Sequence, residues 1–206
     1  MQTQILTMLA LQDSMNSKVH PAWREQGYEW YRAIWVECAE LMDHYGWKWW
    51  KKQQPDVEQV KLELIDIWHF GLSDLLMQHE SVDVLAETLA AALRETYAVQ
   101  EFRTALESFV QTTLNLRAFD LTSFAHLMAA AGLDFDALYS GYVGKNVLNF
   151  FRQDHGYKDG SYIKNWSGRE DNEHLVELVA ELDISSATFK DDLYAALSQR
   201  YRELAR

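Results

Sequence analysis

The stretch V-E-Q-V-K-L-E-L-I-D-I-W-H-F-G-L-S-D-L-L, from Val57 to Leu76, decides the fold class of this chain. Its apolar residues recur at three- and four-residue spacing, the period of a helix that buries one face. Pro55 stands just before the stretch and is favoured in the first turn of a helix. The apolar stripe consists of Val57, Val60, Leu64, Ile67, Trp68, Leu72, Leu75 and Leu76. We therefore predict a long helix that opens at Pro55 and packs against a core.

The helical period continues on both sides of this stretch, without a convincing alternating strand pattern. Between residues 156 and 172 the period is lost, so we expect an ordered polar loop, a kind of segment that often carries function. The further helices that we expect cover residues 4–17, 21–46, 82–101, 102–116, 123–131, 173–182 and 187–204, with one more that is capped by Asp134 and ends at Gly156. We find no repeat or linker and predict an all-α fold, a compact multi-helix bundle that forms a single domain over residues 1–206.

The composition narrows the possible partners. Nineteen basic and 31 acidic residues give a net charge of −12 over 206 residues, which argues against a nucleic-acid-binding protein. A phosphate-bearing ligand would need a local basic cluster, or metal ions that bridge its charge to carboxylates. The lone Cys38 excludes an internal disulfide and a cysteine metal site, so we expect a cytoplasmic protein. The short apolar run from Ile5 to Leu11 predicts neither a signal peptide nor a membrane span.

Two pairs of acidic residues flank apolar stripes on neighbouring predicted helices. Glu37 and Glu40 stand three residues apart, and Glu63 and Asp66 repeat this spacing, so each pair projects from one helical face. A turn over residues 45–55 would let the two helices pack as an antiparallel hairpin and bring the pairs together. Four carboxylates in one pocket need a strong counter-charge, and oxygen ligands favour Mg²⁺ or Mn²⁺. The alternative is that both pairs lie on solvated helical faces.

A basic segment begins at Gly144 and reads G-K-N-V-L-N-F-F-R-Q-D-H-G-Y-K-D-G. Lys145 and Arg152 are two helical turns apart, and Asn149 lies between them on the same face. Such a row can grip a polyphosphate, because a guanidinium binds phosphate bidentately and a tyrosine adds a hydroxyl. On composition alone, a solvated run of charges explains the segment better than a phosphate site does.

Three blocks of the sequence together resemble one known family. They are Q-D-S-M-N at Gln12–Asn16, the two acidic helices, which read Y-R-A-I-W-V-E-C-A-E-L-M-D-H-Y-G-W-K-W-W-K and V-K-L-E-L-I-D-I-W-H, and the basic segment. This combination is similar to the dimeric dUTPases, which belong to the MazG-like all-α NTP pyrophosphatases. The resemblance implies a homodimer that acts on the small molecules dUTP and dUDP, without a nucleic-acid or membrane partner.

The resemblance also assigns roles to individual residues. The metal ligands, which are also the catalytic carboxylates, would be Glu37, Glu40, Glu63 and Asp66, with two or more Mg²⁺ ions or Mn²⁺ as a substitute. The phosphate contacts would be Lys145, Arg152, Tyr157 and Lys158. The uracil edge would be read by Gln12 and Asn16, with Asn149 on the base or sugar. Trp47 either stacks on the base or packs in the core.

The implied reaction converts dUTP, and also dUDP, to dUMP with release of pyrophosphate or phosphate. Glu40 is our choice for the group that accepts the proton of the attacking water. Side-chain amides can flip, so Gln12 and Asn16 reject cytosine only if neighbours fix their orientation. A related dCTP or broad-specificity pyrophosphohydrolase and a non-catalytic nucleotide-binding helical protein remain as alternatives.

Overall fold

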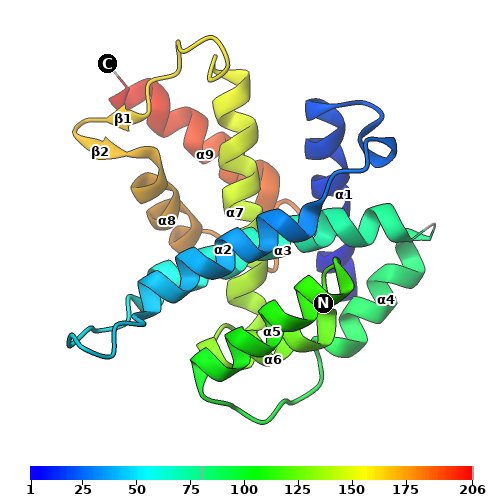
Figure 1. Ribbon diagram of the computed structural model, residues 1–206. Coiled ribbons are helices and arrows are strands. Elements are labelled where there is room, and N and C mark those ends of the chain that lie inside the picture. The colour runs from blue at the N-terminus through cyan, green and yellow to red at the C-terminus, as the bar shows by residue number, and fades with distance from the viewer. Residues whose placement is uncertain (80, 206) are drawn as a thin grey trace. The chain divides into compact units, whose positions relative to one another are not determined.

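A computed structural model describes residues 1–79 and 81–205 (Figure 1). Most of the described residues are helical, which confirms the all-α prediction. The chain divides into two compact units, residues 1–139 and the residues from 140 onward, and α7 (Phe135–Asp154) contributes to both. No helix in the described part of the chain has the length and apolar character needed to cross a membrane.

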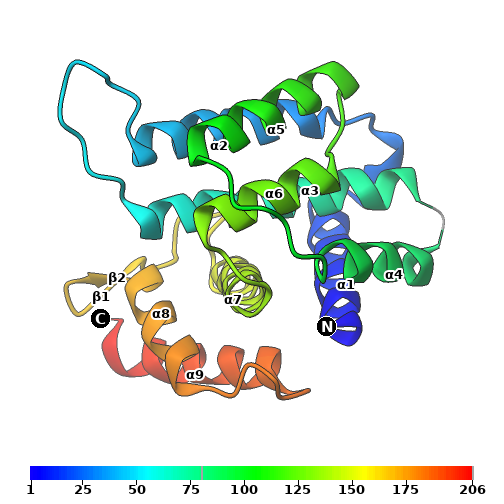
Figure 2. The ribbon, with the colours of Figure 1, turned by 90° about the horizontal axis from the view of Figure 1, so that it is seen from below.

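The first unit is built around a pair of adjacent helices. α2 (Trp30–Tyr45) and α3 (Val57–Gln78) run side by side in opposite directions (Figure 2), as the predicted hairpin requires. Gly46 ends α2 with a positive φ of 92°, which favours glycine, and Asp56 opens α3 by accepting a hydrogen bond from the Gln59 N–H at 3.2 Å. The remaining elements of this unit are α1 (Gln2–Val19), the 3-10 helix η1 (Trp23–Glu25), α4 (Val82–Ala92), α5 (Phe102–Leu116) and α6 (Leu121–Ala131).

α3 supplies the centre of the first core, as its apolar stripe predicts. Every residue of that stripe is buried except Val57, which lies exposed in the first turn of α3. The Trp68 ring stacks on Phe124 at 5.4 Å between centroids. Gly71 admits Phe119 to the helix surface, since an added Cβ there would lie 2.6 Å from the Phe119 ring. α3 therefore packs against α2 and also contacts the aromatic residues Phe119 and Phe124.

The single helix predicted over residues 21–46 was wrong in its first part. The structure places η1 and then Gly27, at φ 64°, before α2 begins at Trp30. A left-handed glycine interrupts a helix, and Glu29 follows it with non-helical angles. The composition of residues 21–30 permits a helix, so this interruption left little signal in the sequence.

The helix predicted over residues 82–101 also proved too long. α4 ends at Ala92, and the Tyr97 hydroxyl donates to the Ala92 carbonyl at 3.1 Å, which satisfies one of the carbonyls exposed at the helix end. The next helix, α5, has its predicted bounds. Its N-cap is Glu101, whose carboxylate accepts from the Thr104 N–H at 2.9 Å.

The second unit contains the end of α7, a short hairpin, α8 (Asp171–Glu181) and α9 (Phe189–Leu204). The hairpin pairs β1 (Asn165–Trp166) with β2 (Arg169–Glu170) inside the segment predicted as a polar loop. Ser167 and Gly168 form its turn with φ values of 50° and 85°, the left-handed angles that tight hairpin turns require. This hairpin was not predicted, because two-residue strands are too short to show a period.

Candidate active site

Three of the four predicted metal-ligand carboxylates meet in the first unit. Glu37 of α2 and Glu63 and Asp66 of α3 each offer a ligand atom, and these atoms all lie within 4.8 Å of one another. Glu63 is buried, while Glu37 and Asp66 are half-buried. The three-residue spacing puts Glu63 and Asp66 on one face of α3, and the antiparallel hairpin brings Glu37 against that face. The donor set fits a hard divalent cation.

The electrostatics of the cluster also favour the binding of a cation. Burial, and then the charges of Asp66, Glu40 and Glu63, raise the pKa of Glu37 to about 7 from an ordinary 4.5. His44 Nε2 lies 3.4 Å from Glu63 Oε1, and this imidazole is charged only when protonated. A carboxylate that resists ionisation among its neighbours gains from an added cation, so this cluster suits a metal ion.

Glu40, the fourth predicted ligand, stands apart from this trio. Its side chain is exposed, one turn beyond Glu37 on α2, and it is not among the residues whose ligand atoms converge. Its charge nevertheless contributes to the raised pKa of Glu37. The position therefore separates Glu40 from the three converging carboxylates, a difference that the sequence did not reveal.

Trp47 lies in the turn between α2 and α3 and is 46% exposed, so it does not belong to the core. Its indole N–H donates to Asp43 Oδ1 at 3.0 Å, and its ring meets Trp50 edge-on at 5.3 Å between centroids. Of the two roles that the sequence left open, packing in the core does not hold. Stacking on a base stays a prediction.

Gln12 and Asn16 are buried and bound to each other. Gln12 Nε2 donates to Asn16 Oδ1 at 3.0 Å and to Ser73 Oγ at 2.9 Å, and Asn16 Nδ2 donates to the same Ser73 oxygen at 3.0 Å. His69 Nδ1 lies 3.0 Å from Gln12 Oε1. Ser73, one of three buried polar residues of α3, was not predicted as a member of this group. The available signal was its four-residue spacing from His69.

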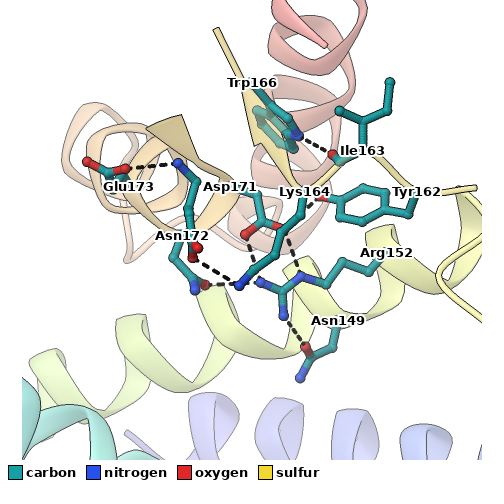
Figure 3. Close-up of polar contacts among 10 residues, drawn as sticks. Asn149, Arg152, Tyr162, Ile163, Lys164, Trp166, Asp171, Asn172 and Glu173 are labelled. Carbon is teal, nitrogen blue, oxygen red and sulfur yellow. Dashed lines mark hydrogen bonds and ion pairs between the residues drawn. The ribbon is translucent and has the colours of Figure 1, made fainter. Parts of the chain in front are cut away.

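The predicted phosphate contact Arg152 lies in the second unit and is held by an acidic residue (Figure 3). Its Nε and Nη2 donate to the two oxygens of Asp171, each at 2.8 Å, and the Tyr162 hydroxyl donates to the same carboxylate at 2.7 Å. Asp171 is fully buried. Burial alone would raise the pKa of Asp171, but the hydrogen bonds from Arg152 and Tyr162 outweigh it and hold that pKa below its ordinary value.

The other predicted contacts of the basic segment vary in exposure. Asn149 is half-buried and accepts from Arg152 Nη1 at 3.4 Å (Figure 3). Lys145 is half-buried, whereas Tyr157 and Lys158 are exposed. The interpretation of this segment as a solvated run of charges therefore agrees with the exposed Lys158, but not with Arg152, which is bound to Asp171. Asp171 and Tyr162 were missed, because nothing in the sequence couples them to an arginine 10 to 19 positions earlier.

Comparison with known proteins adds an independent finding. A protein-family model described as dUTPase matches residues 4–157, more than half of the chain. The matched residues include the four predicted carboxylates, Gln12 and Asn16, and every predicted residue of the basic segment except Lys158. Lys158 directly follows the last matched residue. No curated protein matches the chain.

Proposed function

The chain belongs to the dUTPase family, and from this membership we propose that it hydrolyses dUTP and dUDP to dUMP with Mg²⁺ as its cofactor. The family makes it a dUTP diphosphatase, and the family is metal-dependent. The proposal adds the range of nucleotides, the identity of the ion, and the release of pyrophosphate from dUTP or phosphate from dUDP. It also includes a cytoplasmic homodimer that acts as one functional domain.

The convergence of Glu37, Glu63 and Asp66 carries this proposal. These three residues would hold the metal, with Glu40 completing the set or standing next to it. Mg²⁺, when bound, polarises the phosphoryl oxygens and lowers the pKa of a water towards neutrality. The chain itself contributes a fixed frame of ligands, because two of the three sit on one rigid helix and the third on the helix packed against it.

Glu40 is the proposed acceptor of the proton from the attacking water. An exposed carboxylate outside the converging trio is open to solvent and retains a lone pair for a proton. The other three carboxylates are the better ligands, since their oxygens already point at one another.

The phosphate contacts would be Lys145, Arg152, Tyr157 and Lys158, as the family resemblance implies. Support comes from Arg152, whose guanidinium is fixed by Asp171 and so would lose little conformational freedom on meeting a phosphate. Asn149 would contact the base or sugar, Trp47 would stack on the base, and Gln12 and Asn16 would form the uracil site. Residues 156–172 would close over the phosphates.

The test is release of pyrophosphate and phosphate from dUTP, dUDP, dCTP, dTTP and UTP, each with Mg²⁺ and with EDTA. We expect Mg²⁺-dependent release from dUTP and dUDP alone. Activity on dCTP or on many nucleotides would reassign the substrate but keep the carboxylate site. Activity that persists in EDTA would remove the metal from the proposal.

A further inference from the structure

We propose that Ser73 is a positioning residue that fixes the amides of Gln12 and Asn16 in one orientation, and so makes the chain reject cytosine. The inference rests on the proposed function, because it concerns the base of the proposed substrate. It answers a question that the sequence leaves open, namely whether neighbours prevent these amides from flipping.

The Ser73 hydroxyl has its one proton committed. Its Oγ donates to the carbonyl oxygen of His69, one turn earlier in α3, at 3.0 Å. A serine hydroxyl has one proton and two lone pairs, so towards all other groups this oxygen acts only as an acceptor. Gln12 Nε2 and Asn16 Nδ2 then fill both acceptor positions, at 2.9 Å and 3.0 Å.

This saturated oxygen dictates how both amides face. If Gln12 were flipped, its carbonyl oxygen would face two acceptors, Ser73 Oγ and Asn16 Oδ1. If Asn16 were flipped, its oxygen would face Ser73 and its NH₂ would face the NH₂ of Gln12. Both changes replace hydrogen bonds with repulsive contacts.

Burial makes such a flip costly. Gln12 is 5% exposed, Asn16 is 7% exposed and Ser73 is fully buried, so water cannot readily replace a lost partner. His69 Nδ1 sits opposite Gln12 Oε1 and, as a donor, reinforces the same orientation. The network therefore specifies one arrangement of donors and acceptors, where isolated amides would allow several.

A fixed Asn16 amide distinguishes the two pyrimidines. Its Nδ2 uses one of two N–H donors on Ser73, and its Oδ1 accepts once from Gln12, with no further side-chain hydrogen bond to residues that the structure describes. One donor and one lone pair remain, which match O4 and N3–H of uracil. Cytosine presents a donor at position 4 and an acceptor at N3, so both contacts would be repulsive.

The experiment compares kcat/KM for dUTP and for dCTP in the wild type, Ser73→Ala and Ser73→Thr. Ser73→Ala removes the acceptor and frees the amides to turn, so the dUTP/dCTP ratio should fall about tenfold. Ser73→Thr keeps a hydroxyl that can bond the His69 carbonyl and should retain the wild-type ratio. The matched control is Ser108→Ala in α5, which loses the same kind of bond, Oγ to the Thr104 carbonyl at 2.9 Å, but no amide contact.

The outcomes separate the inference from the proposed function. A wild type that is inactive on both nucleotides would overturn the proposed function and the inference with it. If the wild type prefers dUTP and Ser73→Ala keeps that preference, or loses activity on both nucleotides equally, the positioning role is wrong and the diphosphatase stands. A wild type that cleaves both nucleotides equally well would also show that the positioning role is wrong, and it would leave the diphosphatase activity in place.

A measurement on the wild type alone covers the case in which Ser73→Ala does not fold. In nuclear magnetic resonance spectra, the side-chain NH₂ groups of Gln12 and Asn16 should each show two distinct protons that exchange slowly with water. Addition of dUMP should shift the Asn16 signals, while dCMP should leave them unchanged. Rapid exchange of both NH₂ groups without nucleotide would overturn the fixed orientation.

Discussion

The carboxylate cluster of the first unit and the Arg152–Asp171 pair of the second represent opposite ways to place charge inside a protein. Glu37, Glu63 and Asp66 bring like charges within 4.8 Å, and the pKa of Glu37 rises to about 7. Arg152 and Asp171 form a bidentate pair, and the pKa of Asp171 falls. The cluster gains from a cation added from outside, whereas the pair is electrically complete. Of the two arrangements, the first is therefore the one that an added cation would stabilise.

The largest expected effect comes from removing a charge from the cluster. Glu63→Gln should lower kcat/KM for dUTP by about a thousandfold or more, since a lost metal ligand forfeits several kcal/mol of transition-state stabilisation. The helical circular dichroism signal should not change. Glu58→Gln is the control, because Glu58 lies on the same helix, is exposed and pairs with Lys61. A near-normal rate in Glu63→Gln would remove the metal assignment.

A substitution in the Arg152–Asp171 pair should lower the stability of the fold. Asp171→Asn would leave the Arg152 guanidinium without a counter-charge in a site where the carboxylate is fully buried. We expect a loss of about 3 kcal/mol in the free energy of unfolding, measured in urea. Glu177→Gln, which removes the carboxylate charge from the surface pairs with Arg169 and Arg200, should cost much less, because solvent screens such pairs. Equal losses in the two variants would contradict the comparison.

A smaller effect should follow from Tyr162→Phe. This change removes one hydrogen bond, at 2.7 Å, to the Asp171 carboxylate and keeps the ring. Hydrogen bonds to charged groups contribute about 1.5–3 kcal/mol, and the bidentate arginine remains, so we expect the lower end of that range in urea unfolding. Tyr194→Phe removes a similar bond to the exposed Asp154 and serves as the control. If Tyr162→Phe is as stable as the wild type, Tyr162 does not support the pair.

A further expected effect is a pH dependence of the metal-free protein. Because the pKa of Glu37 is raised from 4.5 to about 7, the folded state holds this proton more tightly than the unfolded chain. Its contribution to stability is therefore complete below pH 4.5 and is lost as the pH rises through 7. In EDTA, the melting temperature of the wild type should fall relative to that of Glu37→Gln over this range. Parallel curves for the two proteins would show that Glu37 does not titrate there.

Much of the first unit, but not all of it, could be predicted from sequence. Helical spacing identified the core stripe of α3 and the bounds of α5, because a buried helical face repeats over many residues. The same spacing paired the acidic residues and anticipated the hairpin that brings three of them together. The breaks at Gly27 and Ala92 escaped because each depends on a few backbone angles.

Contacts between residues that are distant in the sequence limited how much of the candidate site could be predicted. Ser73 binds Gln12 across 61 positions of sequence, and the residue alone is an ordinary serine in an apolar helix. Asp171 likewise gains its role only when the chain folds back on Arg152. Residue type and spacing thus pointed to the groups that we propose act on a ligand. The groups that orient them became visible only in the folded chain.

The exposed tryptophans of the α2–α3 turn give this protein an intrinsic optical signal. Trp47, Trp49 and Trp50 are exposed, whereas Trp68 and Trp166 are fully buried. Indole emission shifts with the surrounding water, so a soluble quencher should reach the first group and spare the second. A nucleotide that covers Trp47 would protect part of that quenchable emission. The binding of the nucleotide could then be timed in a stopped-flow instrument without any label on protein or substrate.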